Sequence, residues 1–144
     1  MVARGVKLGL GTDGAASNNT LDLLRDAQIA SLLHKGVAGD PTVLPARTIV
    51  ELATVGGARV LGLADRVGVL REGMEADLIC LETARPHATP IYDPFSHLVF
   101  AARAADVRHV LVRGRVVVKD WKATTVDEER VRAQAAEAAK RIRG

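Results

Sequence analysis

Asp13 is the residue whose type and position most clearly indicate chemistry. It follows an apolar run over residues 6–12 that predicts a short buried strand, and glycines surround it at positions 9, 11 and 14. A carboxylate at the mouth of a buried strand is costly unless a metal ion, a hydrogen-bond network or a substrate satisfies it. We interpret Asp13 as a metal ligand and catalytic residue. An Asx-type turn or a helix-capping acid is the structural alternative.

Three small polar residues, Ser17, Asn18 and Asn19, follow this acid closely. Their hydroxyl and amide groups add hydrogen-bonding capacity, and the neighbouring glycines allow a backbone or a ligand to approach. We therefore expect these three residues to lie beside a substrate.

The same glycines formally match the dinucleotide-binding fingerprint, Gly9-x-Gly11-x-x-Gly14. We reject that interpretation because Asp13 would place a carboxylate inside the phosphate cradle. The required strand–helix–strand unit is also missing, since the first predicted helix is followed by further helix.

Other residues offer little chemistry by their spacing. The histidines at 34, 87, 97 and 109 form no His-x-His pair and no i, i+4 pair. His34 suits a helix C-terminus, and His97 is ambiguous between a site and a structural hydrogen bond. Cys80, the single cysteine, excludes an internal disulfide and is expected to be a small core hydrophobe.

The elements that must position Asp13 are predicted from periodicity and from breakers. A strand over 6–12 belongs to a parallel sheet only if its neighbours come from elsewhere. The first helix is expected over 21–35, with its N-cap within residues 18–20 and its end at Gly36. A second helix is expected over 45–54, ended by Gly56-Gly57, and a short third helix over 58–61.

The second half of the chain predicts β structure and a closing helix. The expected elements, in order, are a doubly buried strand over 76–82, an irregular loop over 83–96, a short strand or helical turn over 98–102, a hairpin of 107–112 with 115–119 around Arg113-Gly114, and a helix over 126–142 behind a capping box at Thr125–Glu128.

Composition describes an ordinary globular chain. Of its 144 residues, 48% are hydrophobic, 26% charged and only 3% aromatic, so the core must be aliphatic. The net charge of +3 is too small to indicate nucleic acid. No apolar run reaches membrane-spanning length, and a cytoplasmic location is expected. A basic cluster falls on the predicted hairpin and fits a charged sheet edge: Arg103, Arg108, Arg113, Arg115, Lys119 and Lys122.

With these residues in view, the chain resembles the C-terminal part of the amidohydrolase superfamily, in the branch of the 5-methylthioadenosine/S-adenosylhomocysteine deaminases and triazine chlorohydrolases. Five stretches match in the family's order: Gly9–Asn19, Thr54–Leu63, Gly68–Ile79, Tyr92–Val99 and Val110–Val118.

The resemblance implies a mixed α/β and β fold: the last strand and helices of a (β/α)8 barrel over 1–66, C-terminal strands of a small β-sandwich over 67–122, and a closing helix over 123–144. It also implies that Asp13 is the metal-binding aspartate of the last barrel strand. That acid contacts a single zinc, or iron in some members, and helps deprotonate the attacking water. The implied activity is hydrolytic deamination of an adenosine-type or related small N-heterocycle.

The family's metal histidines and its catalytic glutamate have no counterpart here. One carboxylate cannot hold a catalytic zinc, which takes three protein ligands. We therefore expect a C-terminal fragment that is inactive alone and binds no metal, with Met1 an internal methionine or the start of a truncated gene. We also expect self-association through uncovered apolar surface. A non-catalytic partner-binding module and a non-deaminating amidohydrolase such as a dechlorinase are the alternatives.

Overall fold

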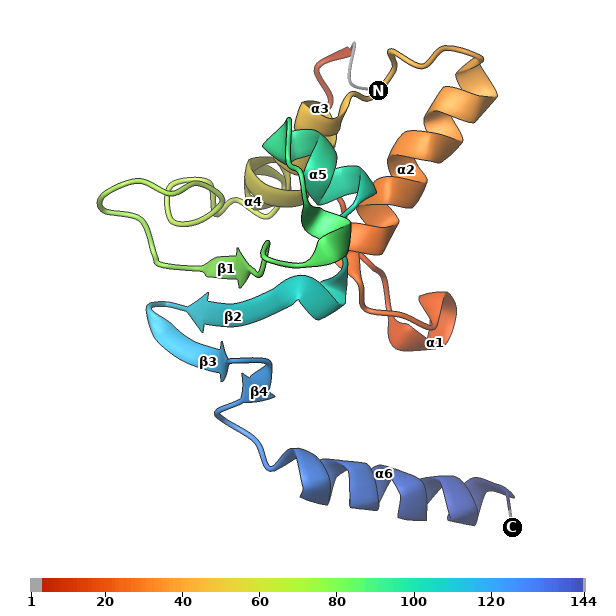
Figure 1. The fold of residues 1–144 in the computed structure, drawn as a ribbon, viewed down its shortest axis with the longest axis vertical. Coiled ribbons are helices and arrows are strands. Elements are labelled where there is room, and N and C mark those ends of the chain that lie inside the picture. The colour runs from red at the N-terminus through yellow and green to blue at the C-terminus, as the bar shows by residue number, and fades with distance from the viewer. Residues whose placement is uncertain (1–3, 144) are drawn as a thin grey trace.

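The computed structural model describes residues 4–143. It is a mixed α/β structure in which a cluster of helices lies beside a small antiparallel sheet, and the last helix extends away from both (Figure 1). The elements are α1 (Ala15–Asn18), α2 (Leu23–Ala38), α3 (Ala46–Glu51), the π-helical segment η2 (Leu52–Gly56), α4 (Gly57–Val60), β1 (Leu78–Leu81), the 3-10 helix η3 (Pro86–Ala88), α5 (Pro94–Phe100), the 3-10 helix η4 (Ala104–Asp106), β2 (Val107–Val112), β3 (Arg115–Lys119), β4 (Lys122–Ala123) and α6 (Glu128–Arg143).

The expected strand over residues 6–12 is wrong, because this segment belongs to no sheet in the described part of the chain. It runs as irregular backbone along the helical layer, where the Leu10 N–H donates to the Leu52 carbonyl at 3.0 Å. A Cβ added at Gly9 would lie 2.7 Å from the Gly57 Cα. Glycine is therefore required there because two backbones touch. An apolar run becomes a strand only when neighbouring strands accept its hydrogen bonds.

Helix α2 covers most of the predicted helix but has different ends. Its N-cap is Asp22, whose carboxylate accepts from the Arg25 N–H at 3.1 Å, rather than the polar residues at 18–20. The helix passes through Gly36 and ends at Gly39, which has a φ of 63°. Gly39 supplies the left-handed stop that we had assigned to Gly36.

The predicted break at Gly56-Gly57 is also wrong. Helix α3, segment η2 and helix α4 form one continuous helical run with a π-helical middle. A Cβ on Gly56 would lie 2.7 Å from the Leu8 carbonyl oxygen. The glycine pair thus allows the N-terminal segment to press against the helix, and it does not end the helix.

The small core lies where α2, α3 and α5 meet, and it is aliphatic as the composition predicts. Ile49 on α3 is fully buried, Val99 on α5 and Ala27 on α2 are buried beside it, and Phe95 packs at the margin. Helix α5 corrects the expected loop over 83–96, which contains η3 and whose last residues already belong to α5. For residues 98–102, which we expected as a strand or a helical turn, residues 98–100 are helical, so the helical alternative is confirmed there.

The sheet has the order β1-β2-β3-β4, with every pair antiparallel. The predicted hairpin of 107–112 with 115–119 is confirmed as β2 and β3. Strand β1 is shorter than expected and is not buried on both faces, since Ile79 and Cys80 are exposed. The expectation that Cys80 is a core residue is therefore wrong. Among residues 4–143, β1 pairs with β2 alone, so its other edge is unpaired.

Between the helical layer and the sheet runs an open apolar groove of about 930 Å³. It is lined by residues of α2, α4, β1 and β2, among them Leu24, Leu78 and Leu111, and by Leu61, which follows α4. Helix α6 forms over nearly its predicted range, with its amino end held by Asp127, which accepts from the Arg130 N–H at 3.0 Å. Among residues 4–143, none of the helices combines the length and hydropathy that crossing a bilayer requires.

Candidate active site

Asp13 lies in an exposed turn between the N-terminal segment and α1. Its backbone is left-handed, with a φ of 57°, a conformation that few residues other than glycine adopt. One carboxylate oxygen, Oδ1, accepts from the Gly14 N–H at 2.7 Å, and the Thr12 hydroxyl donates to the Asp13 carbonyl at 3.1 Å. This bond reaches the next residue, whereas an Asx turn bonds the residue two further on, and the N-cap of α1 is Gly14, so neither structural alternative that we had set for Asp13 is formed.

The three polar residues after Asp13 surround this turn in different ways. The Ser17 hydroxyl donates to the Gly14 carbonyl at 2.9 Å and closes α1 onto the turn. Asn19 ends α1 in the left-handed conformation with a φ of 63°. Asn18 is half-buried, and its side-chain nitrogen donates to the Thr12 carbonyl at 2.9 Å and to the Asp26 carboxylate at 3.1 Å.

Asp26 is a site residue that the sequence analysis missed. It lies in the first turn of α2, where an acid is explained by the helix dipole alone. Only the folded geometry brings it to Asn18. Asn18 and Asp26 lie in different helices, so no helical period relates them and the sequence carried no signal for this contact.

The donor set around Asp13 fits one ligand of a metal site and no more. Within residues 4–143, no three side chains of His, Cys, Asp or Glu gather in a way that could hold a metal ion. The second carboxylate oxygen of Asp13 accepts no hydrogen bond from another described residue, and the residue is exposed. A metal ion bound by further ligands could therefore reach this oxygen. A zinc ion needs at least two further protein ligands.

Among the described residues, none of the four histidines forms a hydrogen bond with Asp13. His34 is exposed near the end of α2, and His97 lies half-buried on α5. His109 on β2 accepts from the Asp120 N–H through Nδ1 at 3.3 Å. His87 contacts Asp106, so a structural hydrogen bond accounts for two of the four.

The His87–Asp106 pair contains the one buried acid of residues 4–143. Asp106 is 3% exposed, and both its oxygens lie 3.0 Å from His87 Nε2. The Arg103 N–H donates to the same carboxylate at 2.9 Å. Burial raises the pKa of Asp106, but the hydrogen bonds from His87 and Arg103 outweigh it and hold the pKa below its usual value. This pair ties η3 to η4 and therefore has a structural role.

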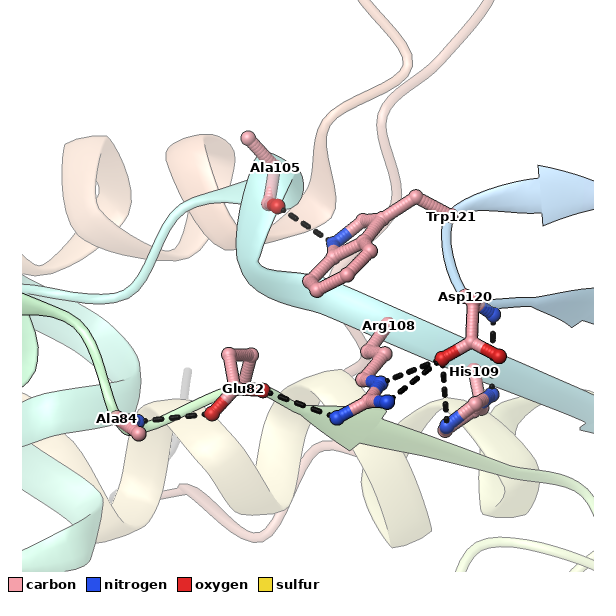
Figure 2. A network of polar contacts seen from close by, with 7 residues as sticks. All are labelled: Glu82, Ala84, Ala105, Arg108, His109, Asp120 and Trp121. Atoms are coloured by element: carbon pink, nitrogen blue, oxygen red, sulfur yellow. Dashed lines mark hydrogen bonds and ion pairs between the residues drawn. The ribbon is translucent and has the colours of Figure 1, made fainter.

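The predicted basic cluster is partly neutralised at the sheet (Figure 2). Arg108 lies between Glu82 and Asp120, at 3.1 Å and 2.7 Å, and the hydrogen bond to Asp120 raises its pKa. Trp121 stacks near the Arg108 guanidinium and donates its indole N–H to the Ala105 carbonyl at 3.0 Å. These contacts fasten the β3–β4 turn to β2 and to η4. Strand β2 pairs with both β1 and β3, so the sheet-edge interpretation is wrong for Arg108.

Comparisons with known proteins identify the family of this chain. The sequence profile of the Amidohydrolase family matches residues 1–117. A 5-methylthioadenosine/S-adenosylhomocysteine deaminase of Desulforudis audaxviator is 49% identical over 142 residues, which are 99% of this chain and 33% of that protein. A 5'-deoxyadenosine deaminase of Methanosarcina mazei is 44% identical over 142 residues, 99% of this chain and 32% of that protein.

Two solved structures resemble the fold closely. A zinc-bound adenosine deaminase from Xanthomonas campestris has a TM-score of 0.95 at 37% identity. The match covers 99% of this chain and 32% of the deaminase chain. An atrazine chlorohydrolase from Arthrobacter aurescens, complexed with zinc, has a TM-score of 0.84 at 33% identity. The match covers 94% of this chain and 30% of the chlorohydrolase chain. The chain thus spans about a third of the length of the relatives it matches. It belongs to the amidohydrolase family.

Proposed function

We propose that this chain is the C-terminal third of a zinc-dependent amidohydrolase, to which it contributes Asp13 as one metal ligand. The observation that carries the proposal is the Asp13 turn: an exposed carboxylate with a free oxygen, held in a fixed backbone, within a chain whose relatives are zinc-bound enzymes about three times longer. Residues 1–66 would form part of a barrel, residues 67–122 part of a β-sandwich, and residues 123–144 a closing helix.

The reaction we propose is hydrolytic deamination of an adenosine-type nucleoside or a related N-heterocycle. Water adds to the ring carbon that carries the amino group, the carbon–nitrogen bond breaks, and ammonia leaves. Bound zinc would supply hydroxide near neutral pH. Asp13 would accept a proton from the attacking water and pass it to the departing amine. The relatives of this chain include 5-methylthioadenosine/S-adenosylhomocysteine and 5'-deoxyadenosine deaminases at 44–50% identity, which supports this choice of substrate class.

A dechlorinating amidohydrolase is the second candidate. The atrazine chlorohydrolase structure favours it, because the match extends over 94% of this chain. Its identity of 33% is lower than that of the deaminases, so we place it second.

The test uses the chain alone and the chain joined to the remaining two-thirds of the Desulforudis relative. The 144-residue chain should bind no zinc and show no deaminase activity. The chimera should bind about one zinc per polypeptide and release ammonia from 5'-deoxyadenosine or 5-methylthioadenosine. In the chimera, Asp13→Ala should lose both. A chimera that folds without zinc, or that keeps its zinc and activity after Asp13→Ala, would refute the proposal.

Self-association of the isolated chain is part of the same proposal. Helix α2 exposes Leu32, Leu33 and Val37, α4 is followed by the exposed Leu61, and the groove between the layers is apolar. Large apolar patches seldom stay uncovered in water. Light scattering at increasing concentration should therefore detect species larger than a monomer, and a stable monomer at high concentration would contradict this.

A further inference from the structure

We propose that Asn18 is a positioning residue for Asp13, anchored by Asp26, rather than a residue that touches the substrate. The inference rests on the proposed function for what Asp13 does. Its geometric part depends only on the described contacts of the turn.

The orientation of the Asn18 amide is fixed by its two partners. The Thr12 carbonyl at 2.9 Å and the Asp26 carboxylate at 3.1 Å are both acceptors, so the group facing them must be the nitrogen. An amide nitrogen carries two N–H donors, and both are used here. Asn18 therefore has no N–H left to offer a substrate.

The contact with Thr12 acts directly on the backbone of Asp13. The Thr12 carbonyl belongs to the peptide plane whose other end is the Asp13 nitrogen, and the tilt of that plane sets the φ of Asp13. A φ of 57° is unfavourable for an aspartate by about 1 kcal/mol, so the conformation persists only where the surroundings enforce it. The bond from the Gly14 N–H is local and exposed, whereas the bond from Asn18 to the Thr12 carbonyl spans six residues and is partly buried.

Asp26 connects this turn to the core. It precedes Ala27, which is buried against α3, and Ser31 one turn later donates to the Leu44 carbonyl at 3.1 Å and is fully buried. The position of Asp26 is therefore fixed by packing. The chain of contacts runs from the core through Asp26 and Asn18 to Thr12, and ends at Asp13.

Four variants separate the two hydrogen bonds. Asn18→Ala removes both, and Asn18→Asp replaces the donor by an acceptor that also repels Asp26. The exchanged pair Asn18→Asp with Asp26→Asn restores a bond between positions 18 and 26 but leaves the Thr12 carbonyl without a donor. Glu129→Gln is the matched control for position 26, because Glu129 is also an acid in the first turn of a long helix.

The first readout is NMR of the 144-residue chain, which requires no metal. Wild type and Glu129→Gln should give backbone shifts at Asp13 and Gly14 typical of a left-handed residue. Asn18→Ala, Asn18→Asp and the exchanged pair should move these shifts toward extended or averaged values. Unchanged shifts in Asn18→Ala, or full recovery in the exchanged pair, would overturn the proposal.

The second readout is the chimera described above. We expect the Asn18 variants to lower zinc affinity or kcat by about 10- to 100-fold, the usual effect of losing a group that orients a metal ligand, with KM nearly unchanged. A raised KM with unchanged kcat would make Asn18 a substrate contact and overturn the inference. A wild-type chimera without zinc would refute the proposed function, whereas the NMR result would still decide whether Asn18 positions Asp13.

Discussion

Asp106→Asn should destabilise the chain strongly at neutral pH. The carboxylate is 3% exposed and satisfies two donors, His87 Nε2 and the Arg103 N–H. Hydrogen bonds to a charged group contribute about 1.5–3 kcal/mol each. The His87 side chain is 29% exposed, so water can replace part of what it loses, and we expect a loss of about 2–3 kcal/mol in the free energy of unfolding. That is a large part of the 5–15 kcal/mol typical of a domain.

The same contact predicts a pH dependence with a definite sign. The pKa of Asp106 is lowered in the folded state, so the folded protein binds this proton less readily than the unfolded chain. Its stabilising contribution is therefore complete above the unfolded pKa of about 4 and is lost as pH falls through the lower folded pKa. The difference in the free energy of unfolding between wild type and Asp106→Asn should therefore become smaller in that acidic range.

Urea denaturation followed by circular dichroism, at a concentration low enough to suppress association, measures both effects. Asp65→Asn is the control, since Asp65 is an exposed acid at the surface. A difference below about 1 kcal/mol at pH 7, or a difference that stays constant down to pH 3, would refute the account of this buried pair.

Other substitutions test the packing. Gly9→Ala should cost about 1–3 kcal/mol or more, because its Cβ would meet the Gly57 Cα at 2.7 Å; denaturation midpoints check this, and an unchanged midpoint would argue against the contact. Ile49→Ala should cost about 2–5 kcal/mol in the same assay, since the side chain is fully buried, and a cost below 1 kcal/mol would contradict its place in the core. Replacing Leu33 and Val37 by Glu should reduce the size of the assemblies seen by light scattering; unchanged assemblies would place the contact elsewhere.

The sequence predicted best the elements that depend on local patterns. The hairpin of β2 and β3 follows from alternation around Arg113-Gly114, and both residues have the positive φ that such a turn demands. Helices α2 and α6 follow from periodicity and capping residues. Their ends moved because more than one residue nearby can cap a helix, and packing decides which does.

The errors all involve contacts between distant parts of the chain. Residues 6–12 have the composition of a strand but no neighbouring strand among the described residues. Gly56-Gly57 has the composition of a break but serves a close approach of backbones. Cys80 lies in an apolar run, yet strand β1 is open on one side. In each case the composition suits an environment that residues 4–143 do not provide.

The candidate site was predictable only at its centre. Asp13 stood out because an acid after an apolar run is unusual, and the resemblance to amidohydrolases named its role. Asp26 was missed because its position is explained equally well by the helix dipole. The orientation of Asn18 was missed because a side-chain amide can donate or accept, and only the two acceptors around it decide which end faces inward.

The open groove between the helices and the sheet affects how this chain can be assayed. Its walls are almost entirely aliphatic, with Leu24, Leu61, Leu78 and Leu111 among them. Environment-sensitive dyes become fluorescent when they leave water for such surfaces, and they ordinarily report the exposure of a core on heating. Here the folded chain should already bind them, so a dye-based melting curve should begin bright and show little further rise. Trp121, the single tryptophan, stacks near Arg108 at the β3–β4 turn and offers a built-in fluorophore that does not depend on that groove.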